Sequence, residues 1–158
     1  MPMSAAEITA YLHRYIPLAK HMGLRVVHWD GLEMRLGAPL KLNSNHEGAG
    51  FGGSIATLGI VAGWAYVHAR LGDEGLEAKR LVVQRSETIY TRPIAGDLVA
   101  ICRDDGKATW RKFARSVAQR GRGRIHLRME MISAEEEGAG QAAAVQEGVY
   151  VVTNSSAP

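Results

Sequence analysis

Thiols are scarce in this chain of 158 residues. Cys102 is the single cysteine, which excludes an intrachain disulfide and a cysteine-based metal site. It lies in the apolar run 98–102, a setting that favours a small buried residue over a nucleophile. One cysteine suits a reducing compartment, and the first residues lack a basic stretch followed by an apolar run. We therefore expect a cytoplasmic protein without a signal peptide.

A strong charge of either sign is also lacking. The formal net charge is +3, too small by itself to indicate a nucleic-acid partner. Apolar residues make up 46% and charged residues 22%, an ordinary globular composition that speaks against disorder. The length suits one domain, so we expect residues 1–158 to form a single domain, without repeats or linkers.

Metal and nucleotide motifs are missing as well. The six histidines are scattered, and no HExxH or CxxC spacing occurs. The glycine-rich segment before residue 54 lacks the lysine of a P-loop, and no GxGxxG follows a strand. We expect neither a metal nor another cofactor.

Asp, Glu, Lys and Arg are absent from residues 51–69, nearly the length of a membrane span. Gly59 and Gly63 within it have the GxxxG spacing of membrane helices. Its four glycines and its polar side chains argue against lipid, and the flanking segments have the patterns of strands. A helix that is apolar all round also occurs in a core surrounded by protein, which is the arrangement we expect here.

Alternation of apolar and polar residues predicts most of the remaining elements. It is strict over Leu32–Asn43 and residues 124–131, which is typical of half-buried strands. Further strands are expected over Leu24–Trp29, Leu81–Arg92, Leu98–Arg103 and Val149–Thr153. Helices are expected after the capping box at Ser4, ending at Pro17, and over residues 110–119. We expect a polar loop over 135–140 and frayed final residues. Short turns favour an antiparallel sheet, so the class is α+β with one buried helix.

Residues 43–54 combine polar side chains, then glycines, then the start of the long helix. Glycine allows a ligand to approach the backbone closely. The first N–H groups of a helix have no internal partner and carry partial positive charge. Gly52 and Gly53 are therefore suited to hold the oxygen of a polarised carbonyl. The alternative is that they only permit a tight turn into the helix.

Two motifs resemble a known family. The first is Asn45-His46-x-Gly48-x-x-Phe51-Gly52-Gly53-Ser54, followed by Gly63-Trp64. It resembles the thioesterase domain that some bacteria carry behind a GNAT acetyltransferase, a member of the hot-dog superfamily. The second, Ile89-Tyr90-x-Arg92-Pro93-Ile94-x-Gly96-Asp97, resembles the hot-dog strand pair after the central helix. The resemblance covers about Leu18 to Thr153 and implies the hot-dog fold, a curved antiparallel sheet around a long central helix.

The chain departs from that family at several points. The acetyltransferase portion is absent, and Ala49 stands where the family is expected to have Thr. The superfamily often carries a catalytic carboxylate on the central helix, yet no Asp or Glu occurs between Gly48 and Arg70. This absence leaves the source of the catalytic base open.

The resemblance implies hydrolysis of an acyl thioester, an acyl-CoA or an acyl-carrier protein, by activated water. His46 is the candidate base, Glu47 an alternative base, and Asn45 a candidate for orienting water or the carbonyl. Gly52 and Gly53 are the candidate oxyanion donors, with Phe51 and Ser54 as candidates for substrate binding. Each has a structural alternative: His46 satisfying the loop or capping the helix, Asn45 in an Asx turn, Glu47 in solvent, Ser54 as a helix cap.

Hot-dog sites resemble one another in lying between two subunits, so a homodimer or a dimer-based tetramer is expected. Ser86, Glu87 and Thr88 of the neighbouring subunit are further candidates, and Glu87 is suited to supply the missing acid unless it faces solvent. Arg111 and Arg115, in the basic run 111–124, are expected to hold the phosphates of coenzyme A or an acidic carrier, or else form a solvated helix face. The competing functions are a non-catalytic acyl-binding hot-dog domain and a hydroxyacyl dehydratase.

Overall fold

A computed structural model describes residues 1–136 and 140–154. The elements follow one another as α1 (Ala5–Tyr15), α2 (Pro17–His21), β1 (Arg25–Trp29), β2 (Glu33–Ala38), α3 (Leu40–Asn43), α4 (Gly52–Asp73), β3 (Arg80–Tyr90), β4 (Leu98–Arg103), α5 (Thr109–Arg120), β5 (Gly123–Ser133), the 3-10 turn η1 (Ala134–Glu136) and β6 (Ala144–Thr153).

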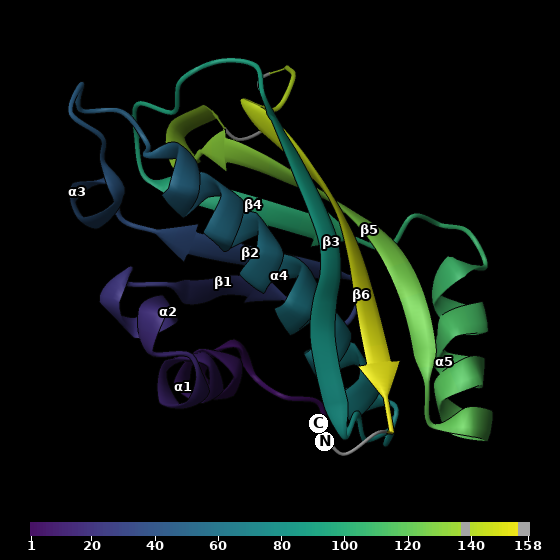
Figure 1. The fold of residues 1–158 in the computed structure, drawn as a ribbon. Helices are drawn as coiled ribbons and strands as arrows, with labels where there is room; N and C mark the ends of the chain where they lie inside the picture. The colour runs from purple at the N-terminus through teal and green to yellow at the C-terminus, as the bar shows by residue number, and fades with distance from the viewer. Residues whose placement is uncertain (137–139, 155–158) are drawn as a thin grey trace.

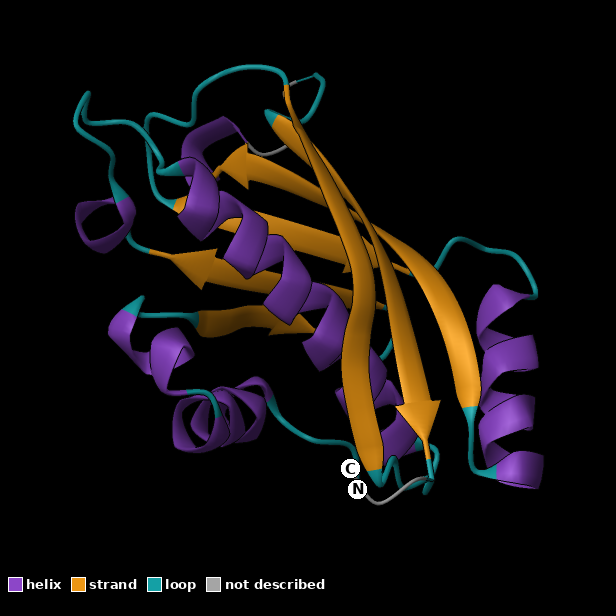
Figure 2. Cartoon of the chain, viewed as in Figure 1, coloured by secondary structure: helices purple, strands orange, loops and turns teal. Residues whose placement is uncertain are grey.

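The six strands form one sheet in the order β1-β2-β4-β5-β6-β3, and every neighbouring pair is antiparallel. The sheet curves, and α4 crosses its inner face from the end near α3 to the end near the chain termini (Figure 1). Helices α1 and α2 lie together near β1, whereas α5 stands alone beside β5 (Figure 2). This is the hot-dog fold, and the expected fold class is confirmed.

Helix α4 is apolar because the fold surrounds most of it. Its buried residues contact the inner sides of β2, β4, β5, β6 and β3 and share one core with α1 and α5. Within the described ranges, no helix is long and apolar enough to cross a membrane. Cys102 lies in the same core with no exposed surface, and burial raises the pKa of its thiol.

The GxxxG spacing of α4 has its explanation in β6. A Cβ built on Gly59 would lie 2.7 Å from Oε1 of Gln146, and one on Gly63 would collide with the phenol of Tyr150. The two glycines thus make room for large side chains of the sheet. Both side chains donate into the helix backbone: Gln146 Nε2 to Ala56 O at 2.9 Å, and Tyr150 Oη to Ile60 O at 2.7 Å.

The expected end of the first helix at Pro17 is confirmed: α1 ends at Tyr15, and Pro17 opens the separate short helix α2, where its missing N–H costs nothing. One expected boundary was wrong near the N-terminus. The strand expected over Leu32–Asn43 ends at Ala38. Pro39 has no N–H for a strand ladder, and the chain turns there into α3. The side-chain amide of the buried Asn43 fixes that turn by donating to Pro39 O at 2.9 Å.

At the C-terminus, β6 begins five residues earlier than the expected strand at Val149. Its inward positions there are Ala144, Gln146 and Gly148, which do not look like core residues in the sequence. The capping box at Ser4 is confirmed, with the Ser4 hydroxyl accepting from Glu7 N at 3.2 Å. Residues 137–139 of the expected polar loop and the expected frayed end at 155–158 lie outside the described residues.

Candidate active site

The N-terminal end of α4 has free backbone donors. Phe51 occupies the cap position, and no side chain accepts from the first turn. The first intrahelical bond comes from Ile55 N to Phe51 O at 3.0 Å. Across the described residues, the N–H groups of Gly52, Gly53 and Ser54 therefore have no protein partner. Three such groups point along the helix axis with partial positive charge, which suits an oxygen that gains negative charge.

The stem of the preceding loop is held by main-chain bonds. Phe51 N donates to Asn43 O at 2.7 Å, and Gly50 N donates to Ile94 O at 2.8 Å. Ser44 and Gly50 form an isolated antiparallel bridge between these bonds. The two ends of the loop are therefore held close together, and the start of α4 is fixed in one position.

The tip of that loop carries three of the candidate residues. Asn45 Oδ1 accepts from Glu47 N at 2.9 Å and Ala49 N at 3.1 Å, so its carbonyl oxygen serves an Asx-type turn. His46 Nε2 lies 3.7 Å from Glu47 Oε1, and the two side chains are 88% and 77% exposed. The loop extends away from the sheet (Figure 1). His46 and Glu47 are therefore together, but both face solvent within one chain.

Phe51 and Ser54 complete the candidates around the glycines. The Phe51 ring is 54% exposed and rests on Gly53, where a Cβ would lie 2.6 Å from Phe51 Cε1. It provides an apolar surface beside the free N–H groups. Ser54 is not the helix cap that the sequence suggested, because it lies two residues inside α4 and the cap residue is Phe51. Its hydroxyl is left for other partners.

The candidates on β3 lie on opposite faces of the sheet. Thr88 Oγ1 accepts from Gln146 Nε2 at 2.9 Å, which places it on the side of α4. Successive strand residues alternate, so Glu87 faces away from α4 in its own subunit. There it pairs across strands with Glu147 and lies 3.7 Å from Arg85 Nη2. Ser86 is exposed and shares the face of Thr88.

Arg111 and Arg115 are exposed on the outer side of α5, whose inner side packs through Trp110, Phe113 and Val117. Trp110 Nε1 donates to Glu74 Oε1 at 2.6 Å, just past the C-terminal end of α4. Gly52 is at the other end of a 22-residue helix, about 33 Å away along the axis. One chain does not bring these arginines to the glycines.

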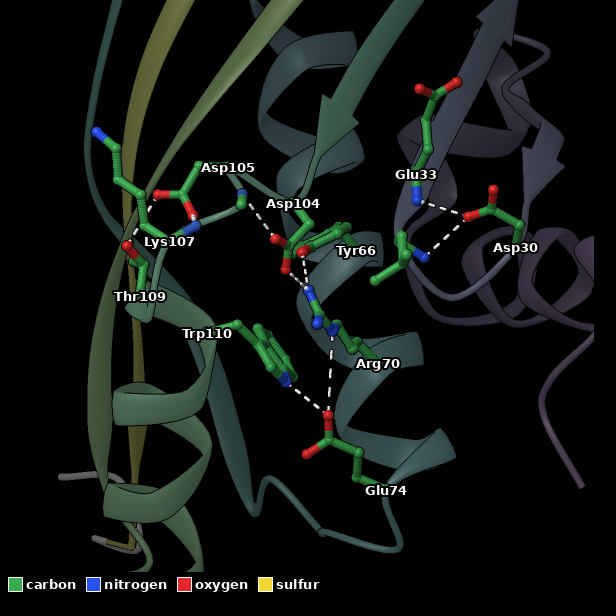
Figure 3. Close-up of polar contacts among 12 residues, drawn as sticks. Asp30, Glu33, Tyr66, Arg70, Glu74, Asp104, Asp105, Lys107, Thr109 and Trp110 are labelled. Carbon is green, nitrogen blue, oxygen red and sulfur yellow. Dashed lines mark hydrogen bonds and ion pairs between the residues drawn. The ribbon is translucent and has the colours of Figure 1, made fainter.

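A second polar cluster surrounds Arg70 (Figure 3). Its guanidinium donates to Tyr66 Oη and forms an ion pair with Asp104, and Glu74 Oε1 lies 4.0 Å from its Nε. Although burial opposes charge on both partners, their mutual hydrogen bond raises the pKa of Arg70 and lowers that of Asp104. A cavity of about 400 Å³ opens above the cluster. Since every member is paired, the cluster ties α4 to the β4–α5 connection and is structural.

Sequence reasoning missed Tyr90, the last residue of β3. Its hydroxyl donates to Gly52 O at 2.7 Å, directly at the candidate site. The second motif contains Tyr90, but only the curvature of the sheet brings it over the start of α4. Among the described residues, no group of three or more His, Cys, Asp or Glu side chains is arranged to hold a metal ion.

A curved antiparallel sheet around a central helix with an open N-terminal end places the chain in the hot-dog class. It belongs to the family described as "Putative thioesterase (yiiD_Cterm)", whose model matches residues 5–154. A comparison with curated protein sequences finds no match.

Solved structures with the same fold are distant in sequence. A Chlorobaculum tepidum protein of unknown function is 23% identical with a TM-score of 0.87, and the match covers 96% of this chain and 94% of that one. A putative thioesterase from Shewanella oneidensis is 21% identical with a TM-score of 0.80, covering 94% and 96%. A Pseudomonas aeruginosa protein described as a probable thioesterase is 23% identical with a TM-score of 0.73, covering 96% of each chain.

Proposed function

We propose that this chain hydrolyses an acyl thioester, carried by coenzyme A or by an acyl-carrier protein, at the N-terminal end of α4. The observation that supports this is the pair of free N–H groups at Gly52 and Gly53, in a chain that belongs to a thioesterase family. Water adds to the thioester carbonyl carbon, and the carbonyl oxygen becomes an oxyanion. Preorganised N–H donors stabilise that charge. The C–S bond then breaks, which yields a carboxylic acid and a thiol.

We propose His46 as the group that takes the proton from water and returns it to the departing sulfur. An imidazole can do both near neutral pH. Asn45 keeps its side-chain amide free to orient water or the carbonyl, since the turn uses only its Oδ1. Glu47 and a neighbouring copy's Glu87 are the alternative bases.

The edge of β3 supports a two-subunit arrangement. Among the described residues, strand β3 pairs only with β6, and its 11 residues leave a row of backbone groups without a strand partner on the other side. Val82, Val83, Ile89 and Tyr90 are exposed along it. The middle of the strand, residues 84–87, is polar and exposed as well. An open strand edge is a template for pairing with another strand. We propose a homodimer, or a tetramer built from it, in which two copies join their β3 edges.

The basic side of α5 is proposed to bind phosphate. Arg111 and Arg115 present guanidinium donors to solvent, and these suit the phosphates of coenzyme A or an acidic carrier. Their distance from Gly52 in one chain means that this role requires α5 of one copy near the loop of another. Replacing both by Gln should weaken substrate binding and reduce its salt dependence, whereas Lys20→Gln with Arg25→Gln should not.

One observation favours a second candidate function. Within α4 the single acidic side chain is Asp73, in the last turn, so the helix offers no carboxylate near Gly52. A non-catalytic acyl-binding domain would need none. A hydroxyacyl dehydratase would need an acid on this helix, and its absence disfavours that activity.

Thiol release from a panel of acyl-CoAs and acyl-carrier proteins separates these functions. We expect release from at least one thioester at a rate proportional to protein concentration. Binding of acyl-CoA by calorimetry without thiol release from any member of the panel would favour the acyl-binding function and contradict hydrolysis.

A further inference from the structure

We propose that Tyr90 is a positioning residue of this site, whose hydroxyl holds the Gly52–Gly53 peptide group and thereby aims the Gly53 N–H at the substrate carbonyl. This inference rests on the proposed function, because it assigns to one side chain the alignment of an oxyanion donor.

A single hydrogen bond joins Tyr90 to the first turn of α4. Tyr90 Oη donates to Gly52 O at 2.7 Å. The carbonyl of Gly52 and the N–H of Gly53 belong to the same planar peptide group, so a partner that fixes the oxygen also fixes the direction of the N–H. A hydrogen bond to the carbonyl further polarises the amide and strengthens its N–H as a donor.

The start of α4 needs such a partner because its sequence is permissive. Gly52 and Gly53 form the first two positions of the helix, and glycine loses more conformational freedom on ordering than any other residue. No side chain caps the first turn. The Tyr90 hydroxyl holds this turn through a carbonyl and leaves the N–H groups unoccupied for a ligand, which a capping side chain would not do.

Tyr90 is also placed where a substrate can reach. Its side chain is half-exposed, and a Cβ on Gly52 would lie 3.6 Å from its hydroxyl, so the ring covers one side of the glycine pair without filling the space beyond. Partial burial raises the pKa of the phenol, and the hydroxyl therefore remains a donor at neutral pH.

The molecule contains a matched control for this role. Tyr90, Gln146 and Tyr150 donate to the carbonyls of residues 52, 56 and 60, which lie one turn apart along one side of α4. Tyr150 Oη to Ile60 O has the same length and chemistry as the Tyr90 bond. Ile60 lies two turns inside the helix, and the N–H that follows its carbonyl is already bonded within the helix. Loss of the Tyr150 hydrogen bond should lower stability but change no substrate contact.

The test compares Tyr90→Phe with Tyr150→Phe. Both keep the ring and remove one hydroxyl. We expect Tyr90→Phe to lower kcat about tenfold at nearly unchanged KM. The Gly53 N–H is still present in this variant but is less well aligned with the oxyanion, so only part of its stabilisation is lost. Tyr150→Phe should lower the melting temperature and leave kcat unchanged. An unchanged kcat in Tyr90→Phe, or an equal fall in both variants, would overturn the positioning role.

A second readout does not depend on turnover. The ¹⁵N order parameter of the Gly53 amide should be near 0.85 in the wild type and fall toward 0.6 in Tyr90→Phe, while Tyr150→Phe leaves it unchanged. If the wild type hydrolyses no thioester and only Tyr90→Phe loosens Gly53, the proposed function fails and the positioning of Gly53 stands. If hydrolysis occurs and Gly53 is equally rigid in all three proteins, the function stands and this inference fails.

Discussion

Gly59 and Gly63 lie where α4 packs against side chains of β6, and neither has room for a Cβ. The side chains of Gln146 and Tyr150 fill that space and bond to helix carbonyls. The absence of side chains at these two residues is therefore a packing requirement of the sheet. The same GxxxG spacing that occurs in membrane helices here serves contact between a helix and a strand.

Gly63→Ala should destabilise the protein by about 1–3 kcal/mol, because the new methyl group collides with the Tyr150 phenol in a packed core. Gly72→Ala in the same helix is the control. A Cβ there meets nothing within 4 Å, so it should stabilise by about 0.5–1 kcal/mol through helix propensity. Denaturant unfolding measures both. Equal effects of the same sign would contradict this role for Gly63.

Three substitutions identify the catalytic base. If His46 is the base, His46→Ala should lower kcat by about 10²–10⁴-fold. Its exposure predicts an unchanged melting temperature. Glu47→Gln and Glu87→Gln should have milder effects, and only His46→Ala should remove the limb of the pH–rate profile in the histidine range. Near-normal kcat in His46→Ala would eliminate the assignment, and a large loss in either Gln variant would transfer the role to that carboxylate.

At the scale of elements, the Arg70 cluster joins the C-terminal half of α4 to the chain segment before α5. The side chains of Arg70 and Asp104 are 14% and 21% exposed, so removing one charge leaves the other poorly solvated. Asp104→Asn should therefore lower the free energy of unfolding at pH 7, by about 1–3 kcal/mol.

The pH dependence of that loss has a definite sign. The pKa of Asp104 is lower in the folded protein than the usual value of about 3.9 in an unfolded chain. Ionised Asp104 thus contributes stability above about pH 4 and loses it as the pH falls through the folded pKa. The difference in unfolding free energy between wild type and Asp104→Asn should shrink below pH 4. A difference that stays constant down to pH 2 would contradict the ion pair's contribution.

Elements with regular patterns were predictable from the sequence, and those with interrupted patterns were not. Helix α5 lies within one residue of its expected range because its apolar residues follow one helical period. Strand β4 matches its range because a continuous apolar run stands between two turn sequences. Strand β2 was extended too far, since the alternation continues through Pro39 into α3. The first half of β6 was missed because Gln146 is a polar residue that donates to the α4 backbone, and Gly148 leaves room for Tyr150 and Met129.

For the candidate site, the sequence indicated the glycines at the start of α4 but not their surroundings. Local pattern identifies a loop that leads into a helix, so Gly52 and Gly53 could be proposed from it. Tyr90 lies 38 residues further along the chain and reaches Gly52 only through the curvature of the sheet. Strand alternation predicts that Glu87 and Thr88 face opposite ways, but only the pairing with β6 shows that Thr88 is the one on the side of α4.

At the scale of the whole molecule, the main open feature is the β3 edge. Light scattering should give at least twice the chain mass of 17.1 kDa. Val82→Glu with Ile89→Glu should shift the protein toward monomer, because carboxylates on an edge strand oppose strand pairing. Leu32→Glu, at another exposed apolar residue, should not. A monomeric wild type at working concentration would contradict the shared-edge dimer.

One pair of variants tests the backbone donors at the start of α4. Gly52→Pro removes the first N–H of the helix at a position where proline is well tolerated. The preceding Phe51, at φ −67° and ψ 130°, already has the backbone conformation that proline requires of its predecessor. Gly52→Ala adds a side chain in ordinary contact with Tyr90 and keeps the N–H.

The measurement is the kcat of thioester hydrolysis in these two variants. If the Gly52 N–H stabilises the oxyanion, Gly52→Pro should lower kcat by about 10²–10³-fold, while Gly52→Ala stays within a few-fold of wild type and both remain folded. Equal kcat values in Gly52→Pro and Gly52→Ala would contradict a catalytic role for this backbone donor.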